Sequence, residues 1–304
     1  MHLHADGHAT ARRSLGQGGR TVSPLAWGMW RFQGEDVAAA QRLVETALDC
    51  GMDFFDTADI YGPDNGEGFG AAERLLGRVL GAAPALRGRM TLATKAGIEI
   101  GTPYNSSADY LCAACEASLR RMGVDQVELF QIHRPDILAH PAEVAEALST
   151  LRAAGKIAEA GVSNYTPAQV SALQAHLGFP LASIQPEFSP LAIDPLSDGI
   201  LDQALQHDLL VLAWSPLGGG RLMTEDTPRA AAVAAALDVV AQGAGVSRSA
   251  AAYAWVMAHP ARPVPIVGSQ RVEHIRGAAD ALKVNFDRKA WYAVLTAARG
   301  APLP

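Results

Sequence analysis

The segment MDFFDTADIYG, residues 52–62, decides the fold, because a short apolar run ends there in the carboxylate of Asp56. Two later apolar runs end in the same way: MTLATKAG leads to Lys95, and VELFQIHRP leads to His133. The three polar residues are 39 and 38 positions apart, which is about the length of one strand–helix unit. We therefore expect adjacent parallel strands that bring the three side chains to one rim.

The alternation of short β-rich runs with longer helical segments extends in both directions from this segment, as is typical of parallel βαβ units. The predicted strands are residues 25–29, 52–56, 90–95, 127–133, 157–163, 182–185, 209–214 and 264–267. The predicted helices are residues 37–50, 71–80, 108–122, 142–154, 167–177, 200–207, 229–257 and 272–282, with an extra helix at 288–299 that packs on the outside or the rim. No linker or shift in composition marks two halves, which disfavours an open doubly wound sheet. The sequence predicts an α/β fold, a (β/α)8 TIM barrel in a single domain over residues 21–304, preceded by a flexible lead-in at 1–20.

The composition bounds the class of protein. Of 304 residues, 49% are apolar and 18% are charged, which provides ample material for a core and does not resemble a disordered chain. The formal net charge of −6 and the pI near 5.8 argue against a nucleic-acid partner, although a local anion site can exist in an acidic protein. No run suits a signal peptide or reaches the ~20 apolar residues that span a membrane. We expect a cytoplasmic protein, a monomer or weak homo-oligomer, with no membrane partner.

Two short motifs carry no predicted function. The three cysteines are too few and odd in number for a disulfide framework, and the CxxC of Cys112 and Cys115 falls in a predicted helix without a second ligand pair. We interpret that motif as helix packing and predict no metal site. The glycines of LGQGGR, residues 15–20, follow no strand and open no convincing helix, so they do not resemble a dinucleotide-binding turn.

The three strand-end residues and Tyr61 form a predicted polar cluster, because Tyr61 lies five residues past Asp56 in a loop that can fold back over the rim. A tyrosine donates a proton poorly near neutral pH unless a cation stabilises its phenolate. Lys95 can supply that cation, Asp56 can keep the lysine charged and oriented, and His133 can offer a second hydrogen bond. The cluster contains no serine or cysteine nucleophile, so it favours proton transfer to an oxygen.

Other interpretations of these residues exist. Each residue alone can have an ordinary structural role: a strand-end lysine can reach water, an aspartate can cap a helix and a histidine can pack in the core. The occurrence of all three at neighbouring strand ends favours an active site instead. A barrel isomerase or aldolase acting on phosphosugars would use Lys95 as a Schiff-base amine. Asp56 should keep that lysine protonated, which counts against this alternative.

An ordered series of motifs runs along the chain from about residue 25 to 282: DTADIYG, TKAG, IHRPD, GVSNYTPAQ, QPEFSPL, LAWSPLGGGR and PIVGSQRVEH. Through these motifs the chain resembles the aldo-keto reductase superfamily, and it looks like a bacterial branch that reduces aldehydes and ketones. This resemblance implies a catalytic tetrad of Asp56, Tyr61, Lys95 and His133, with NADPH as hydride donor to a small carbonyl substrate. It also leaves one alternative from another class, a cofactor-sensing regulatory subunit of the same fold.

The resemblance implies a cofactor site that spans three loops. Ser163, Asn164 and Gln185 would hold the nicotinamide carboxamide, and Trp214 would stack on the ring. The pyrophosphate would lie under Ser215, Leu217, Gly218, Gly220 and Arg221, where glycines admit a close approach of the backbone. The 2′-phosphate would bind at Gly268, Ser269 and Arg271 with His274 nearby, which favours NADPH over NADH. Relatives usually continue with a Glu-Asn pair that holds the adenine, whereas this chain has Gly277 and Ala278.

Trp30, in GMWRF after the first strand, resembles a tryptophan of the substrate pocket wall, with simple core packing as the alternative. The sequence does not name the substrate, because the loops at 57–70, 102–108 and 215–228 shape the pocket.

Overall fold

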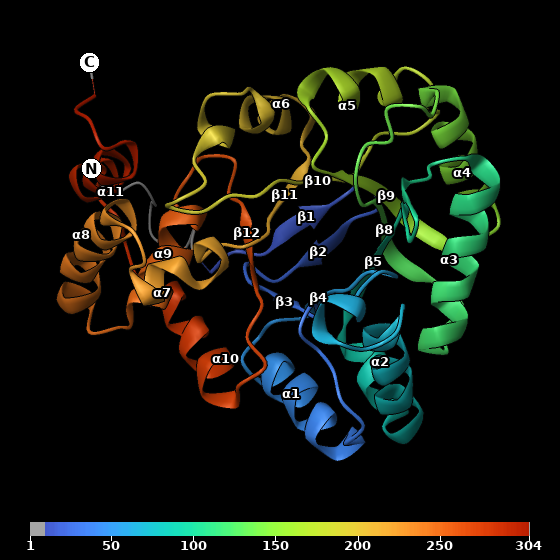
Figure 1. Cartoon of the computed structure of the whole chain (residues 1–304), viewed down its shortest axis with the longest axis horizontal. Helices are drawn as coiled ribbons and strands as arrows, with labels where there is room; N and C mark the ends of the chain where they lie inside the picture. Colours follow the sequence, from blue (N-terminus) through green and yellow to red (C-terminus); the bar gives the residue numbers. More distant parts are fainter. Residues whose placement is uncertain (1–9, 304) are drawn as a thin grey trace.

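The structure, a computed structural model, describes residues 10–303. Eight parallel strands close into a barrel in the order β10-β11-β12-β3-β4-β5-β8-β9, with helices around them (Figure 1). The barrel strands are β3 (Ala26–Gly28), β4 (Phe54–Asp56), β5 (Thr91–Ala96), β8 (Val127–Ile132), β9 (Ile157–Ser163), β10 (Ser183–Gln185), β11 (Leu210–Ala213) and β12 (Val264–Val267). Each lies within a predicted strand or within one residue of it. The predicted (β/α)8 barrel is confirmed.

The helices follow the strands as the periodicity predicts. Seven of them are α1 (Val37–Asp49), α2 (Ala71–Ala82), α3 (Ala108–Met122), α4 (Pro141–Ala153), α5 (Pro167–Gln174), α6 (Ile200–His207) and α10 (Val272–Ala278). Local capping sets several of their first residues: Asp36 accepts a hydrogen bond from the amide of Ala39, and Thr166 forms a capping box with Gln169. A short hairpin, β6 (Ile98–Glu99) and β7 (Thr102–Tyr104), occupies the loop after β5.

The single helix predicted at 229–257 is wrong, because the chain forms two helices there, α8 (Pro228–Ala244) and α9 (Arg248–Met257). Gly245 adopts a left-handed conformation with φ of 66°, which ends α8, and the Ser247 side chain accepts from the amide of Ala250 to begin α9. No single helix between residues 10 and 303 is long and apolar enough to cross a membrane. Together α8 and α9 reach that length and apolarity, but they meet at 97°.

The extra helix, α11 (Arg288–Arg299), packs on the outside of the barrel beside α8, as predicted (Figure 1). Trp291 of α11 stacks on Trp255 of α9 with ring centroids 4.9 Å apart, and each indole N–H donates to the other residue's carbonyl at 3.1 Å. The Arg229 guanidinium donates to the carbonyl of Ala298 at 2.6 Å, which fixes the end of the helix.

An ordered hairpin occupies the later part of the predicted flexible lead-in, from residue 13 onward. Strands β1 (Arg13–Leu15) and β2 (Arg20–Val22) pair antiparallel, and residues 1–9 of that prediction lie outside the described part of the chain. Gly16 in the turn has φ of +64°, and a Cβ there would lie 2.4 Å from the Glu159 carboxyl carbon, so the glycines of LGQGGR serve this turn. The hairpin lies across the barrel in Figure 1.

The hairpin seals the amino-terminal end of the barrel. The amide of Ser23, just after β2, donates to Asp53, which directly precedes β4, at 2.8 Å. Leu15 and Val22 are fully buried and join a cluster of inward-facing strand residues: Ala26, Phe54, Ala93, Leu129, Ala182, Leu210, Leu212, Val264 and Ile266. The rim at which the strands lead to Asp56, Lys95 and His133 therefore lies at the opposite, carboxyl end of the strands.

Replacing Leu15 with alanine is expected to lower the free energy of unfolding by about 2–5 kcal/mol, because it opens a cavity at the sealed end of the barrel. Urea unfolding followed by circular dichroism measures this change. The matched control is Leu138→Ala, since Leu138 is 92% exposed and its loss should be nearly neutral. An equal effect of the two substitutions would show that the hairpin does not support the barrel.

Candidate active site

A buried ion pair lies at the carboxyl end of two neighbouring strands. Asp56 ends β4 and Lys95 lies near the end of β5, and these strands pair in parallel. The Lys95 Nζ lies 2.7 Å from Asp56 Oδ2 and donates to the carbonyl of Thr57 at 2.9 Å. The lysine side chain is fully buried, and the aspartate side chain is 3% exposed. The strand ends thus hold a charged lysine in place with almost no contact with solvent.

Tyr61 and His133 complete the four-residue cluster. The Lys95 Nζ donates to the Tyr61 hydroxyl at 3.2 Å, and the tyrosine and histidine rings meet edge to face with centroids 5.8 Å apart. His133 follows β8, and its amide bonds to the carbonyl of Ala96 at 2.8 Å. Its Nδ1 is buried and has no hydrogen-bond partner in residues 10–303. The structure therefore brings together all four residues that the sequence singled out.

Burial and charge set the protonation states of the cluster. Burial alone would lower the pKa of Lys95, but Asp56 and Tyr61 outweigh it and raise the pKa above 10.5. Burial, followed by the charges of Lys95 and Arg134, lowers the pKa of His133 well below 6.5. The lysine is charged and the histidine neutral at pH 7.

The pKa of Tyr61 differs from the sequence expectation, in which the nearby lysine lowers it. Burial raises the pKa of this tyrosine above 10.0; it outweighs the opposing charge of Lys95, and the charge of Asp56 acts in the same direction as burial. The hydroxyl therefore keeps its proton throughout the neutral range.

The predicted nicotinamide residues form a second network beside the cluster. Gln185 Nε2 donates to Asp56 Oδ1 at 2.9 Å, which links the two groups. The Ser163 hydroxyl donates to the carbonyl of Gln185 at 2.8 Å, and the Asn164 amide donates to Ser163 Oγ at 2.8 Å. Trp214 Nε1 donates to Asn164 Oδ1 at 2.9 Å, so the indole has a fixed orientation. Asn164 has φ of 60°, an unusual backbone conformation for a residue other than glycine.

The predicted pyrophosphate loop lies after β11. Gly218, Gly219 and Gly220 have φ of 61°, 70° and 101°, and Ser215 has φ of 50°. Successive left-handed residues need glycine, and they leave the loop surface without side chains. Arg221 Nε donates to the carbonyl of Gly218 at 2.9 Å, which fixes the arginine against the loop. Leu217, the remaining predicted member, is half-buried against the core.

The residues predicted to hold the 2′-phosphate lie between β12 and α10, after Gly268. The Ser269 hydroxyl is 3.2 Å from His274 Nδ1 and accepts from the amide of Arg271 at 3.3 Å. The Arg271 side chain is 66% exposed, and its Nε donates to Glu273 at 2.6 Å. Glu273 was not among the residues predicted for this site, although its position two residues after Arg271 can be read from the sequence. The arginine thus has an intramolecular carboxylate partner.

Trp30 lies on the surface rather than in the core, with 41% of its side chain exposed. Its Nε1 donates to Asp64 at 3.2 Å, and the guanidinium of Arg31 lies 4.4 Å from the ring centroid. Core packing is therefore excluded for this residue. Its contact with Asp64 joins the loop after β3 to the loop that carries Tyr61.

The model of the aldo/keto reductase family matches residues 24–297 of the chain. The chain belongs to the aldo/keto reductase family. It is 57% identical over 296 residues to the 6-dehydroglucose reductase of Novosphingobium aromaticivorans, with 97% of each chain covered. This aldo/keto reductase is also 39% identical to the 6-dehydroglucose reductase of Agrobacterium fabrum, over 92% of this chain and 95% of the relative.

Further comparisons agree with this assignment. The oxidoreductase YdhF of Escherichia coli is 36% identical, over 96% of this chain and 99% of the relative. The crystal structure of a thermostable aldo-keto reductase with the inhibitor epalrestat superposes with a TM-score of 0.80 at 22% identity, covering 95% of this chain and 100% of that chain. The latter supports the barrel fold alone. The chain is thus an enzyme of the oxidoreductase class.

The sequence reasoning missed a group of buried charges behind the active site of this aldo/keto reductase. Asp59 is fully buried, and neither of its carboxyl oxygens meets hydrogen-bond geometry with another group in the described residues. Glu73, also fully buried, accepts from the Thr94 hydroxyl at 2.5 Å and from Arg121 Nε at 2.7 Å. Burial, and then the charge of Glu73, raises the pKa of Asp59 well above 3.8. The sequence shows the Asp59 carboxyl group within DTADIYG, but it does not show that this group is buried.

Substituting Asp59→Asn is expected to stabilise the protein increasingly as the pH rises. Because burial raises the folded-state pKa of Asp59, its ionisation works against folding. The penalty is absent below pH 3.8, grows between pH 3.8 and the folded-state pKa, and is constant above the folded-state pKa. At full ionisation the gain should reach about 1–3 kcal/mol. Thermal unfolding of both proteins from pH 4 to pH 9 measures it. The control is the exposed Asp226→Asn, and a pH-independent difference for Asp59→Asn would contradict the assignment.

Proposed function

We propose that this chain reduces an aldehyde or ketone to an alcohol with NADPH, using Tyr61 as the proton donor. The observation that carries the proposal is the Tyr61 hydroxyl within 3.2 Å of a lysine whose other partner is a buried aspartate. NADPH, when bound, supplies the hydride that adds to the carbonyl carbon. The tyrosine gives its proton to the carbonyl oxygen, and the resulting phenolate is stabilised by the lysine charge. The product is the alcohol.

The other two members of the tetrad orient the reaction. A neutral His133 keeps one ring N–H, which can donate to the substrate oxygen without competing as a strong acid. Asp56 holds Lys95 by a charge-assisted hydrogen bond, and Gln185 holds the second carboxylate oxygen of Asp56. The lysine is thereby a positioned cation. The same pairing counts against a Schiff-base mechanism, since a protonated amine is a poor nucleophile.

The residues present fit a nicotinamide cofactor. Ser163, Asn164 and Gln185 present hydroxyl and amide groups beside the tetrad, and the fixed indole of Trp214 offers a stacking surface. The left-handed glycines of residues 218–220 offer a backbone cradle for a pyrophosphate. Ser269 and Arg271 suit a 2′-phosphate, which is why we propose NADPH as the preferred form. Arg271 would exchange its contact with Glu273 for the phosphate.

We propose a sugar aldehyde of the 6-dehydroglucose type as substrate. Two relatives named 6-dehydroglucose reductase align over more than nine-tenths of the chain, one at 57% identity. Chemically, hydride addition at an aldehyde on carbon 6 and protonation of its oxygen regenerate a primary alcohol, which is the reaction that the Tyr61 geometry supports. Trp30 and the loop of residues 57–70, which are joined through Asp64, are the proposed wall of the sugar pocket.

The decisive experiment follows the loss of reduced nicotinamide with NADPH and NADH in parallel, using 6-dehydroglucose and a panel of simple aldehydes and ketones. We expect turnover with NADPH and the highest kcat/KM on 6-dehydroglucose. Turnover of other carbonyls but not of 6-dehydroglucose would overturn the proposed substrate and leave the proposed carbonyl reduction in place. Tight cofactor binding without turnover of any carbonyl would overturn the proposal that this chain reduces carbonyls and would favour a cofactor-sensing role.

We also propose a cytoplasmic location, which the cysteines support. All three cysteines are unpaired. Burial raises the pKa of the Cys115 thiol to about 12, so it is unreactive, and its neighbour Cys112 lies on the same helix without forming a disulfide. Between residues 10 and 303 no three His, Cys, Asp or Glu side chains lie close enough to hold a metal ion. The CxxC is thus best explained as helix packing in a reducing compartment.

A further inference from the structure

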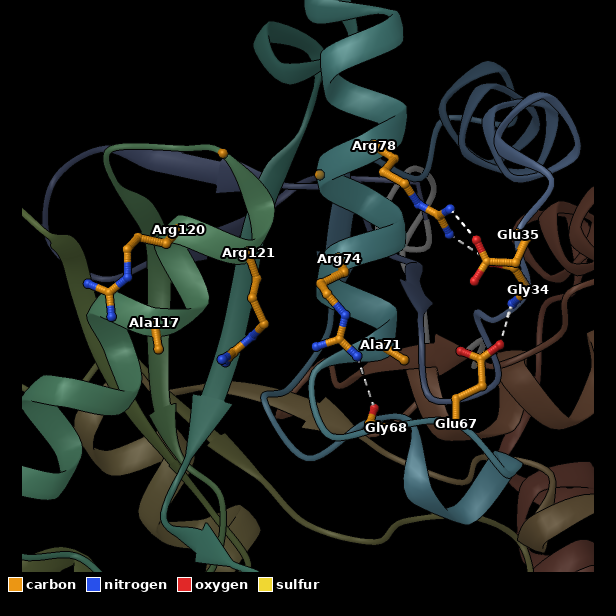
Figure 2. A pocket seen from close by; sticks show the side chains of 12 residues that line it. Gly34, Glu35, Glu67, Gly68, Ala71, Arg74, Arg78, Ala117, Arg120 and Arg121 are labelled. Carbon is orange, nitrogen blue, oxygen red and sulfur yellow. Dashed lines mark hydrogen bonds and ion pairs between the residues drawn. The ribbon is translucent and has the colours of Figure 1, made fainter.

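A hollow of about 1050 Å³ lies on the flank of the barrel along α2, with α3 on one side of that helix and residues 34–35 and 67–68 on the other (Figure 2). None of the residues assigned to catalysis or to the cofactor lines it. Its lining consists of glycines and alanines together with four arginines and two glutamates: Arg74, Arg78, Arg120, Arg121, Glu35 and Glu67. The hollow therefore combines small residues, which leave space, with guanidinium groups that bind anions.

The glycines also set the position of one wall. A Cβ on Gly77 would lie 2.2 Å from the carbonyl oxygen of Arg121, and a Cβ on Gly70 would lie 2.6 Å from Arg121 Cδ. The absence of these side chains allows α2 and α3 to approach closely and places Arg121 across the gap. The space thus depends on small residues at specific positions.

Two of the arginines are held in place before any ligand arrives. Arg121 Nε donates to the buried Glu73 at 2.7 Å, and its Nη2 donates to Ser118 at 2.9 Å. Arg74 Nη1 donates to the carbonyl of Phe69 at 2.7 Å. Figure 2 shows the side chains of Arg74 and Arg121 extending alongside each other toward the same end of the hollow. Preorganised guanidinium groups lose little side-chain entropy on binding.

The carboxylates of the hollow are already engaged. Glu35 pairs with Arg78 at 2.5 Å, and Glu67 accepts from the amide of Gly34 at 2.7 Å. In contrast, Arg74 donates only to backbone carbonyls within the described chain, and Arg120 lies 3.7 Å from Glu116, with 70% of the arginine side chain exposed. Arg74 and Arg120 thus carry charge that no carboxylate at hydrogen-bond distance neutralises, in a protein whose net charge is −6.

We propose that this hollow binds a small molecule that carries two or more phosphate charges. Guanidinium groups match phosphate oxygens in paired hydrogen bonds, and arginines spaced along one hollow can each meet a different charged group of a multivalent anion. The hollow slightly exceeds the usual size range of small-molecule sites, about 300–1000 Å³, and is larger than one phosphate requires. The site is separate from the proposed reductase site and does not depend on it.

Isothermal titration with inorganic pyrophosphate at constant ionic strength tests the site. With the proposed cofactor site filled by saturating NADP⁺, we expect saturable binding to one site, weakened about tenfold or more in the double variant Arg74→Gln/Arg120→Gln. The matched control Arg42→Gln, an exposed arginine on α1, should leave the affinity unchanged. Arg221→Gln should also leave it unchanged, which separates this site from the proposed pyrophosphate loop of the cofactor.

Two results would overturn the proposal: absence of saturable binding, and an affinity that falls with Arg221→Gln but not with the double variant. Equal affinity for orthophosphate and pyrophosphate would overturn the claim that the hollow prefers a ligand with more than one phosphate group. Circular dichroism verifies folding of the double variant. If that variant does not fold, Arg120→Gln alone gives the test, because within residues 10–303 this exposed side chain makes only the distant contact with Glu116.

Discussion

Replacing Tyr61 with phenylalanine is expected to lower kcat for carbonyl reduction by about 10²–10⁴-fold, the usual contribution of a positioned acid. The substitution removes only the hydroxyl that lies 3.2 Å from Lys95 Nζ, while the ring keeps its place against His133. Cofactor binding, measured by fluorescence titration with NADPH, should remain unchanged because the hydroxyl contacts none of the residues proposed to hold the cofactor. Steady-state kinetics with a saturating carbonyl substrate gives the loss.

The matched control is Tyr292→Phe, since Tyr292 lies 43% exposed on α11, away from the rim. It should leave kcat unchanged. The raised pKa of Tyr61 adds a second readout, the pH dependence of kcat. Deprotonation of Tyr61 should not lower the kcat of the wild-type protein below pH 10.0, because the tyrosine keeps its proton there. Turnover by the Tyr61→Phe protein at the wild-type rate would remove the tyrosine from the mechanism.

The strand ends of the site could be predicted from the sequence because each marks the point where an apolar run stops. A period of one βα unit places Asp56, Lys95 and His133 on adjacent strands, and closure of the barrel brings their side chains together. The electrostatic result was harder to predict. The pKa of Tyr61 depends on how deeply the loop buries the ring, and sequence spacing carries no information on that depth.

The buried charges behind the site show a second limit of prediction from the sequence. Asp59, Glu73 and Arg121 come from a loop and two helices, and their contacts depend on the faces that α2 and α3 turn toward each other. A single sequence does not give that helix rotation at atomic detail. The amino-terminal hairpin was missed because its strands are three residues each, too short for a period-two pattern.

Replacing Lys95 with methionine is expected to cause a large loss of stability as well as of activity. The substitution leaves the buried Asp56 carboxylate without its cation, and in the described part of the chain only the hydrogen bond from Gln185 remains on that side chain. Breaking one partner of a buried ion pair costs about 3–5 kcal/mol. Turnover should also fall, because the phenolate that forms at Tyr61 loses its stabilising charge. Urea unfolding and steady-state kinetics measure the two effects separately.

The double variant Asp56→Asn/Lys95→Met separates stability from chemistry. Removing both charges abolishes the uncompensated carboxylate, so the double variant should regain most of the stability that Lys95→Met loses. Its turnover should stay as low as that of the single variant, because the positioned cation is still absent. Lys289→Met, at an exposed lysine of α11, is the matched control and should change neither quantity. If activity returned together with stability, the lysine would be a structural group rather than the cation that assists Tyr61.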